Sequence, residues 1–246
     1  MDKVTIPFEA TWTSIGIGLS GGADSALLTY LICDTVVEHQ MQNFKIHVIN
    51  HIRCWKTKPW QRYDALGVYD WLKNRFPTIE FELHTNFIAP ELEWGNKGPT
   101  LVDEYGKTVS GDNIEARAFA EYVCVTNKVN AFFNGVTRNP RDVEFKGMQP
   151  RNVEPSEDNK HLEIMEHMGF LACHPFRFIE KSWVIAQYRE LDLLDLFHIT
   201  RSCEGDNSTR PEVFMGLDYK TYQPNQPVPI CGRCFWCRER RWALEQ

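Results

Sequence analysis

A glycine loop between a strand and a helix, close to the start of the chain, limits the folds that this sequence can adopt. Residues Thr13–Leu19 are β-branched and apolar, which is typical of a short buried strand. The sequence Ser-Gly-Gly-Ala-Asp-Ser follows at 20–25, and the apolar stretch from Ala26 to Val37 has helical periodicity. Glycines let a backbone approach an anion closely, and the following helix adds the positive end of its dipole. Residues 20–25 therefore predict a phosphate-binding loop, in which the hydroxyls of Ser20 and Ser25 are further donors.

Strands and helices alternate along the rest of the chain. We expect strands at 44–50, 79–84 and 131–136, and helices at 60–76, 113–128, 162–168, 179–191, 192–197 and 237–245. Residues 86–112 have no sustained period and predict a long loop that covers a site. This order predicts an α/β fold with a parallel sheet and helices on both of its faces. Ligands of such sheets bind beyond the carboxyl ends of the strands, so the segments 20–25, 50–58 and 134–138 should meet at one edge.

Three of the eight cysteines form a Cys-x2-Cys-x2-Cys run at Cys231, Cys234 and Cys237. Three thiolates at this spacing can share one ion, and Cys203 is the best candidate for a fourth ligand. The expected centre is a closed four-cysteine zinc site, with one ion per chain. An iron–sulfur cluster is the alternative, although the ferredoxin pattern requires a further cysteine where Arg241 stands. We therefore expect a nucleotide domain at 1–200 and a zinc-binding segment at 201–246 that packs on it.

The composition argues against several classes of protein. The 246 residues carry 27 basic and 33 acidic side chains, and the net charge of −6 argues against broad binding to a nucleic-acid backbone. No apolar run approaches the ~18 residues of a membrane span, and the chain does not begin with a basic and then apolar leader. We expect a cytoplasmic protein with no membrane partner and no stable nucleic-acid partner. The sequence leaves the oligomeric state open, and a homodimer is one arrangement that fits it.

The glycine loop resembles that of the PP-loop ATP pyrophosphatase family. It is not a mononucleotide P-loop, because no lysine follows the glycines, and it lacks the dinucleotide pattern G-x-G-x-x-G. Ser-Gly-Gly-x-Asp-Ser after a first strand is instead the PP-loop pattern. The resemblance implies an adenine-nucleotide alpha-hydrolase-like fold. It also implies that ATP, with Mg²⁺, is cleaved between its α and β phosphates to adenylate a substrate oxygen, after which a nucleophile displaces AMP.

Within this family, the end of the chain resembles the 7-cyano-7-deazaguanine synthases. Ser202-Cys203, a gap, and Cys-Gly-x-Cys-x-x-Cys-x-x-Arg at 231–240 carry the likeness, together with Asn134-Gly135-Val136. The resemblance implies an ATP-dependent ligase that acts on 7-carboxy-7-deazaguanine. Ammonia would give the amide, and a second adenylation would give the nitrile, with release of AMP and pyrophosphate.

The same resemblance assigns roles to individual residues. It implies that the catalytic side chains are Asp24, Ser25, Lys181 and Arg117. It implies that the nucleotide contacts Leu19, Ser20, Gly21, Gly22, Ala23, Asp24, Ser25, Asn50, Asn113 and Gly135. Two departures from the family pattern affect the substrate more than ATP. Asp112 stands where the family has an arginine, which Arg117 can replace from the same helix face, and only Arg53 matches the family motif after the second strand.

Three other functions are compatible with these motifs. A related ligase could stop at the amide, and an ATP-dependent tRNA thiolase would use the same loop. The excess of acidic side chains and the missing RNA-binding domain argue against the thiolase. A zinc-stabilised nucleotide-binding module without turnover would bind ATP and release no pyrophosphate.

Overall fold

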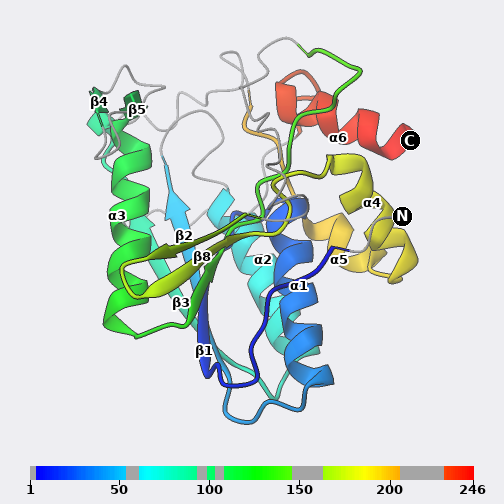
Figure 1. Cartoon of the computed structure of the whole chain (residues 1–246). Helices are drawn as coiled ribbons and strands as arrows, with labels where there is room; N and C mark the ends of the chain where they lie inside the picture. The colour runs from blue at the N-terminus through cyan, green and yellow to red at the C-terminus, as the bar shows by residue number, and fades with distance from the viewer. Residues whose placement is uncertain (1–3, 54–60, 93–98, 103–107, 146–162, 206–229) are drawn as a thin grey trace.

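A six-stranded sheet forms the centre of the molecule, which a computed structural model describes at residues 4–53, 61–92, 99–102, 108–145, 163–205 and 230–246 (Figure 1). In spatial order its strands are β3 (Glu80–Phe87), β2 (Lys45–Ile52), β1 (Ser14–Gly18), β6 (Ala131–Phe133), β8 (Phe170–His174) and β7 (Glu163–His167). All neighbouring pairs are parallel except β7 and β8, which are antiparallel. The predicted parallel α/β sheet is confirmed.

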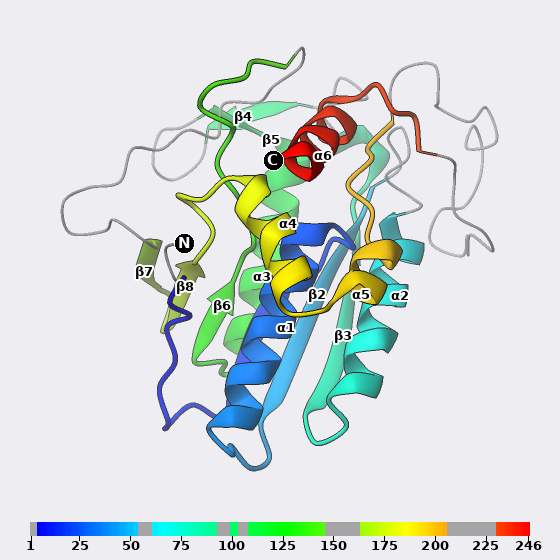
Figure 2. The ribbon, with the colours of Figure 1, turned by 90° about the vertical axis from the view of Figure 1, so that its right-hand side faces the viewer.

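Helices cover both faces of this sheet, as the alternation of elements predicts (Figure 2). The described helices are α1 (Ala23–Glu38), α2 (Gln61–Arg75), α3 (Gly111–Thr126), α4 (Lys181–Glu190), α5 (Leu194–Ile199) and α6 (Phe235–Glu245). The α3 helix lies on one face, and α1, α2, α4 and α5 lie on the other. From β1 the chain first moves outward to β2 and β3 and then returns past β1 to β6. Right-handed crossovers in opposite directions place their helices on opposite faces.

The two faces of β1 differ in a way that fits their covering helices. Ile15 and Ile17 are fully buried in the main core, on the side of α1. On the other side Gly16 leaves room for α3, because an added Cβ there would lie 3.0 Å from the Sγ atom of Cys124. Strand β1 is thereby held between two helical layers, and the loop that follows it is placed on a rigid element.

The expectation of a helix at 162–168 is wrong. Residues Glu163–His167 form β7, which turns at Met168 and Gly169 and pairs with β8. Both turn residues have positive φ, 47° at Met168 and 87° at Gly169, and this matches the right-handed twist of a tight hairpin. Five residues are too few for the spacing of apolar side chains to distinguish a strand from a helix. The Met168-Gly169 turn is the local feature that indicates a hairpin.

The expected long loop at 86–112 contains regular structure as well. Strands β4 (Thr100–Val102) and β5 (Thr108–Ser110) form a separate antiparallel pair, and a 3₁₀ turn lies at Pro90–Leu92. Residues 93–98 and 103–107 of the predicted loop lie outside the described part of the chain. In the described segments, no helix has both the length and the apolar content needed to cross a bilayer.

Candidate active site and metal centre

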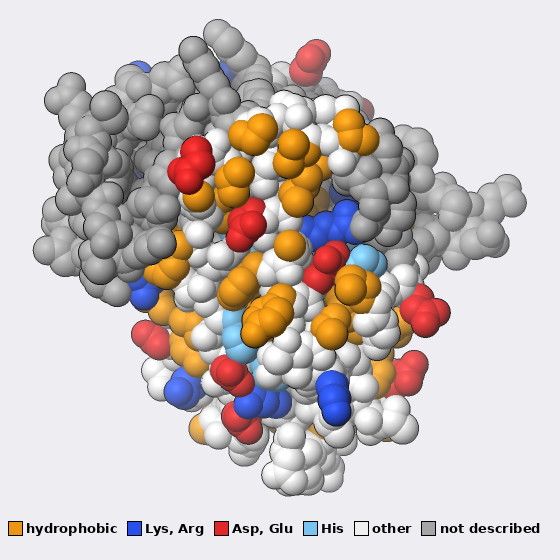
Figure 3. All heavy atoms as spheres, turned by 90° about the vertical axis from the view of Figure 1, so that its left-hand side faces the viewer, with side chains coloured by type: hydrophobic (Ala, Val, Ile, Leu, Met, Phe, Trp, Pro, Cys, Tyr) orange, Lys and Arg blue, Asp and Glu red, His pale blue; other side chains and the backbone are white. Residues whose placement is uncertain are grey.

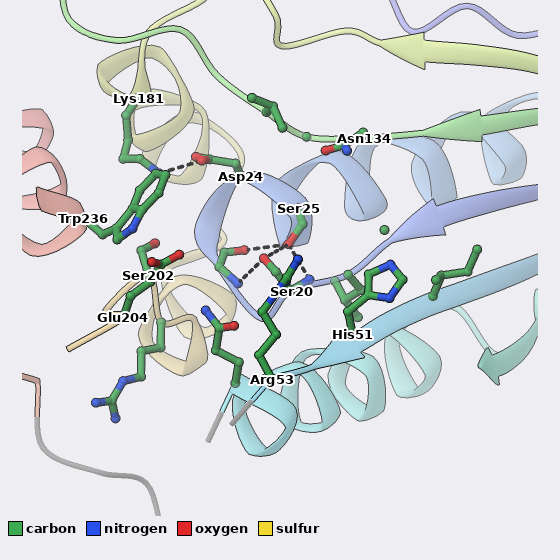
Figure 4. Close-up of a pocket in the computed structure, with 18 of the residues that line it drawn as sticks. Ser20, Asp24, Ser25, His51, Arg53, Asn134, Lys181, Ser202, Glu204 and Trp236 are labelled. Atoms are coloured by element: carbon green, nitrogen blue, oxygen red, sulfur yellow. Dashed lines mark hydrogen bonds and ion pairs between the residues drawn. The ribbon is translucent and has the colours of Figure 1, made fainter. Parts of the chain in front are cut away.

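A cavity of about 360 Å³ opens at the carboxyl ends of β1, β2 and β6 (Figure 4). It lies at the point where strand order reverses, between β1 and β6, which is where open α/β sheets bind ligands. The predicted loop contributes Ser20, Gly22, Asp24 and Ser25, and Gly135 follows β6 on the opposite side. Of the segments predicted to meet at one edge, the loop, His51 and Arg53 at the end of β2, and Asn134–Val136 after β6 do so, whereas residues 54–58 lie outside the described part of the chain.

Hydrogen bonds between its two serines close the loop on itself. The Ser20 amide donates to Ser25 Oγ at 3.2 Å, and the two hydroxyl oxygens lie 3.1 Å apart. The Gly22 amide donates to Ser20 Oγ at 3.3 Å. Among the described residues, no side chain caps the N-terminus of α1, which begins at Ala23 within this segment. The first turn of α1 therefore presents backbone amides and the positive end of the helix dipole to the cavity.

Close packing behind the loop explains its glycines. Gly21 has φ of +79°, and an added Cβ would come within 2.6 Å of the Ala65 amide nitrogen at the start of α2. At Gly135 an added Cβ would lie 3.0 Å from the Asp24 carbonyl. Asn50 does not line the cavity, since it is buried and donates to the Leu19 carbonyl at 2.7 Å. Its amide thus holds the end of β1 in place from β2.

The Asp24 carboxylate and the Lys181 ammonium form an ion pair in the cavity. Their Oδ2 and Nζ atoms are 2.6 Å apart, although Lys181 begins α4 and is separated from Asp24 by most of the chain. Lys181 is only 1% exposed. The other carboxylate oxygen of Asp24, Oδ1, is buried and has no hydrogen-bond partner among the described residues. A buried oxygen of this kind is a suitable ligand for Mg²⁺.

A carboxylate from the end of the chain lies on the other side of Lys181. Glu239 of α6 is fully buried, and its Oε2 lies 3.8 Å from Lys181 Nζ. The ammonium thus faces one carboxylate from the loop and one from the cysteine segment. Helix α6 packs against α4 and thereby contributes one of the two negative charges that surround Lys181.

Arg53 supplies a second cation, from the end of β2. Its Nε atom donates to Asp112 Oδ2 at 3.0 Å, and its Nη2 atom donates to Asn113 Oδ1 at 3.4 Å. Asp112 therefore fixes the guanidinium at the start of α3, where the family resemblance led us to expect an arginine. Asn113 reaches the cavity only through Arg53. Arg117 lies one turn further along and pairs with Glu121 at 2.9 Å, outside the cavity.

Several lining residues were not identified from the sequence. The segment after α5 contributes Arg201, Ser202 and Glu204, and Trp236 of α6 covers the same side of the cavity (Figure 4). Arg201 is buried, and its backbone amide donates to the Gly21 carbonyl at 2.8 Å. These residues are distant from the loop in sequence, and only the motifs Ser202-Cys203 and Cys231–Cys237 indicated their regions. The roles assigned above to individual site residues stay predictions.

His51 at the end of β2 also lines the cavity. Its ring meets Phe119 edge-on, and its Nδ1 atom is buried with no hydrogen-bond partner among the described residues. Burial, and secondarily the charge of Arg53, lowers the pKa of His51 from 6.5 to about 4. The imidazole is therefore neutral near pH 7.

The His51 pKa predicts a loss of stability in acid. The unfolded chain takes up this proton near pH 6.5 and the folded chain only near pH 4, so the free energy of unfolding falls as the pH drops through that window. Between pH 7 and pH 4.5 the His51→Gln variant should lose roughly 2–3 kcal/mol less than the wild type. Denaturant unfolding at the two pH values measures the difference. Equal losses in the two proteins would show that His51 does not titrate in this way.

The four predicted cysteine ligands come together beside the cavity. The Sγ atoms of Cys203, Cys231, Cys234 and Cys237 lie within 4.8 Å of one another, and those of Cys231 and Cys237 are 3.9 Å apart. Tetrahedral zinc with Zn–S bonds of ~2.3 Å places its sulfurs roughly 3.8 Å apart. The thiols therefore have the spacing to hold one metal ion.

Backbone amides surround these sulfurs. Cys203 Sγ accepts hydrogen bonds from the amides of Gly205 and Cys231, both at 3.4 Å, and Cys231 Sγ accepts from Cys234 at 3.3 Å. Hydrogen bonds from the Cys234 and Cys237 thiols lower the pKa of the Cys203 thiol. Such outer-shell donors orient metal ligands and neutralise part of their charge.

Arg240 ties the cysteine segment to the main domain. Its guanidinium lies over the Phe197 ring, 4.0 Å from the centroid, and donates to the carbonyls of Thr200 and Phe197, both at 3.0 Å. The end of α5 is thus fixed to α6 immediately before Cys203. Arg201, Ser202 and Trp236 line both the cavity and a smaller pocket beside Cys203 and Cys237, so they lie between the two.

Comparisons with known proteins point to tRNA thiolases. No protein-family model matches the chain. The tRNA-specific 2-thiouridylase MnmA of Serratia proteamaculans is 26% identical over 234 residues, which cover 87% of this chain and 58% of that protein. The enzyme of the same name from Klebsiella pneumoniae subsp. pneumoniae is 25% identical over 72% of this chain and 49% of its own length. The chain thus spans only about half the length of these relatives.

A solved structure of a tRNA thiolase is also similar. It is the U34-tRNA thiolase NcsA from Methanococcus maripaludis with its [4Fe-4S] cluster, with a TM-score of 0.46 and 18% identity over 82% of this chain and 63% of that one. The two curated relatives are 2-thiouridylases, so the finer likeness to 7-cyano-7-deazaguanine synthases stays a prediction. The chain is a distant homologue of the tRNA-specific 2-thiouridylases, and it has the α/β parallel-sheet fold of a PP-loop protein with a four-cysteine cluster near its C-terminal end.

Proposed function

We propose that this protein uses ATP to adenylate an oxygen atom of its substrate, with release of pyrophosphate. The observation that carries the proposal is the meeting, in one cavity, of an uncapped helix start, a serine-glycine loop and the Asp24–Lys181 ion pair. Anion binding at such a loop needs backbone donors and placed cations, and both are present. The distant homology to ATP-dependent enzymes supports the same assignment.

The residues have distinct tasks in this reaction. The loop amides and the Ser20 and Ser25 hydroxyls hold the departing phosphates, and Asp24 Oδ1 is placed to bind the Mg²⁺ that neutralises their charge. Lys181 balances the charge that develops on pyrophosphate. The substrate oxygen attacks the α-phosphorus, and the bond to the oxygen that bridges to the β-phosphorus breaks. The main work of the protein is to position these groups and stabilise developing charge.

The relatives favour the carbonyl oxygen of a tRNA base as the acceptor. Both 2-thiouridylases and NcsA are named for thiolation of tRNA. In that reaction a sulfur nucleophile would displace AMP from the adenylated carbon. The chain as a whole carries a net charge of −6, which repels the tRNA backbone. Contact with tRNA would therefore depend on a local surface of basic side chains. We take tRNA thiolation as the first candidate.

The cysteine motif favours a second acceptor, 7-carboxy-7-deazaguanine. Ser202 and Trp236 line the cavity beside the cysteine cluster, so the motif behind that likeness forms part of the site wall. Here ammonia would be the nucleophile, and the amide or the nitrile would be the product. Both candidates share one first step, adenylation of an oxygen on an electrophilic carbon.

For the metal we propose a single zinc ion that pins α6 to the domain. The 3.9 Å sulfur separation fits the edge of a zinc tetrahedron. A [4Fe-4S] cubane distributes its four thiolates over four irons and separates them further. The cluster is then structural, and it takes no part in electron transfer.

The test separates the shared step from the acceptor. Purified protein with ATP and Mg²⁺ is given unmodified tRNA and a sulfide source in one reaction, and 7-carboxy-7-deazaguanine and ammonium in another. AMP and pyrophosphate are measured together with the mass of each acceptor. A thiolated base supports the first candidate, and a mass change of the deazaguanine supports the second. Tight ATP binding with no AMP under any condition would contradict the proposal in favour of a binding module.

A further inference from the structure

Two histidines and a glutamate converge on the sheet, away from the cavity. His47 lies on β2, and Glu82 and His84 lie on the edge strand β3. In the parallel register His47 is paired with Glu82, and His84 is paired with Ile49, so all three side chains project from one face. It is the α3 face, because Ile49 packs with residues of α3. None of the three side chains lines the ATP cavity.

The three side chains bring their ligand atoms together. His47 Nδ1 lies 3.0 Å from His84 Nε2. The Glu82 carboxylate reaches both rings, with Oε2 3.6 Å from His47 Nδ1 and Oε1 3.6 Å from His84 Nε2. Zinc with bonds of ~2.0–2.1 Å to nitrogen and oxygen separates its tetrahedral ligands by roughly 3.3 Å. One ligand atom from each of the three residues lies within 4.8 Å of the others, so the three side chains are close enough to share a single ion.

The electron pairs needed for coordination are available at this point. Only one hydrogen can lie between two ring nitrogens 3.0 Å apart, so at least one of them offers a lone pair to the shared space. Two imidazoles and one carboxylate are a donor set typical of zinc.

A simple ion-pair ladder is the competing explanation. Lys45 Nζ lies 2.8 Å from Glu82 Oε2 and 2.8 Å from Glu80 Oε1, so Glu82 already has a cationic partner. A metal ion that takes the place of Lys45 at Glu82 leaves the ion pair between Lys45 and Glu80 intact. Metal binding therefore costs only one of the two ion pairs. The ladder also gives no reason for two imidazole nitrogens to face each other beside a carboxylate.

Solvent can reach the cluster from one side. The His47 side chain is 3% exposed, whereas that of His84 is 17% exposed and that of Glu82 is 43% exposed. On the face that Figure 3 shows, histidine reaches the surface beside acidic and basic side chains. An ion bound here would thus have a buried ligand behind it and an open coordination position in front, where water can bind.

We propose that His47, Glu82 and His84 form a second divalent-metal site, for zinc or a similar ion, distinct from the four-cysteine centre. The ion would join the edge strand β3 to β2 through side chains, in addition to the backbone ladder. The proposal does not depend on the ATP chemistry, because it rests on other residues and a different part of the sheet.

Zinc binding to protein whose cysteine site is already filled tests the proposal. The chain is purified with one equivalent of zinc, and further Zn²⁺ is added in a calorimetric titration. The wild type should bind one more equivalent. His84→Gln and Glu82→Gln should weaken this second site more than about 100-fold, because even loss of an outer-shell partner costs about 10–100-fold. Lys45→Met should tighten it, since the competing cation is removed.

Matched controls keep the result interpretable. His39→Gln, at an exposed histidine that ends α1, should leave the second equivalent unchanged. Both changed ligands are at least partly exposed, so the metal-free variants should fold, with a Tm near that of the wild type. Cobalt at the second site should give visible d–d bands without thiolate charge transfer. The proposal is wrong if no second equivalent binds, or if the His84→Gln variant binds it as the wild type does.

Discussion

Replacing Asp24 with alanine should lower ATP-dependent release of pyrophosphate by at least about 10²-fold. The carboxylate holds Lys181 at 2.6 Å and presents a second, buried oxygen with no partner among the described residues. Its removal takes away the proposed magnesium ligand and leaves Lys181 facing Glu239 alone. The Ser25→Ala variant should also lose activity, because the Ser25 hydroxyl closes the loop through Ser20. AMP formation, followed by chromatography, measures both effects.

Metal content and a matched variant show whether the effect is local. Elemental analysis should find unchanged zinc in the Asp24→Ala protein, since the cysteine cluster lies on other elements. Asp34→Ala removes an exposed carboxylate from the same helix and should keep wild-type turnover. If the Asp24→Ala protein releases pyrophosphate at the wild-type rate, the loop assignment is wrong.

Local sequence predicted the frame of this site because each signal lies within one short segment. Strand β1, the glycine loop and α1 follow one another in the chain, and their period and glycines can be recognised directly. Cys231, Cys234 and Cys237 are equally local, and their spacing alone indicated a shared ion. The parallel sheet followed from the alternation of elements, and its carboxyl edge located the cavity.

The remaining wall of the cavity depends on long-range packing that no local pattern carries. Arg201 reaches the loop through a backbone hydrogen bond to Gly21, and Glu239 reaches Lys181 across the whole domain. The environment of Asp64 also depends on long-range packing. It is buried behind Gly21, and burial raises its pKa to about 6 although Arg201 opposes the shift. A carboxylate in the first turn of an amphipathic helix gives no sign of this environment in sequence.

The position of α6 links the four-cysteine cluster to the cavity. The helix begins at the cysteine cluster, contributes Trp236 to the cavity wall and buries Glu239 beside Lys181. An ion bound by the four cysteines would therefore control two features of the cavity without lying in it. This arrangement predicts that loss of the metal abolishes activity as well as reducing stability.

Replacing Cys234 with serine should remove the zinc and with it the activity. The ion holds Cys203, before the long intervening segment, to the start of α6, so its loss frees the helix that carries Trp236 and Glu239. We expect a fall in Tm of at least about 10 °C, because structural zinc contributes several kcal/mol to folding. Elemental analysis, thermal unfolding and AMP formation measure the three effects.

Chelation and a second cysteine variant separate the metal from the thiol itself. Cys173→Ala removes a buried thiol of β8 outside the cluster, and it should keep its zinc and most of its turnover. A strong chelator should reproduce the Cys234→Ser defect in the wild type, and added zinc should reverse it. Iron and sulfide in the purified protein would overturn the zinc assignment. Full activity in metal-free protein would show that α6 stays in place without the ion, and that the coupling through Glu239 and Lys181 does not need it.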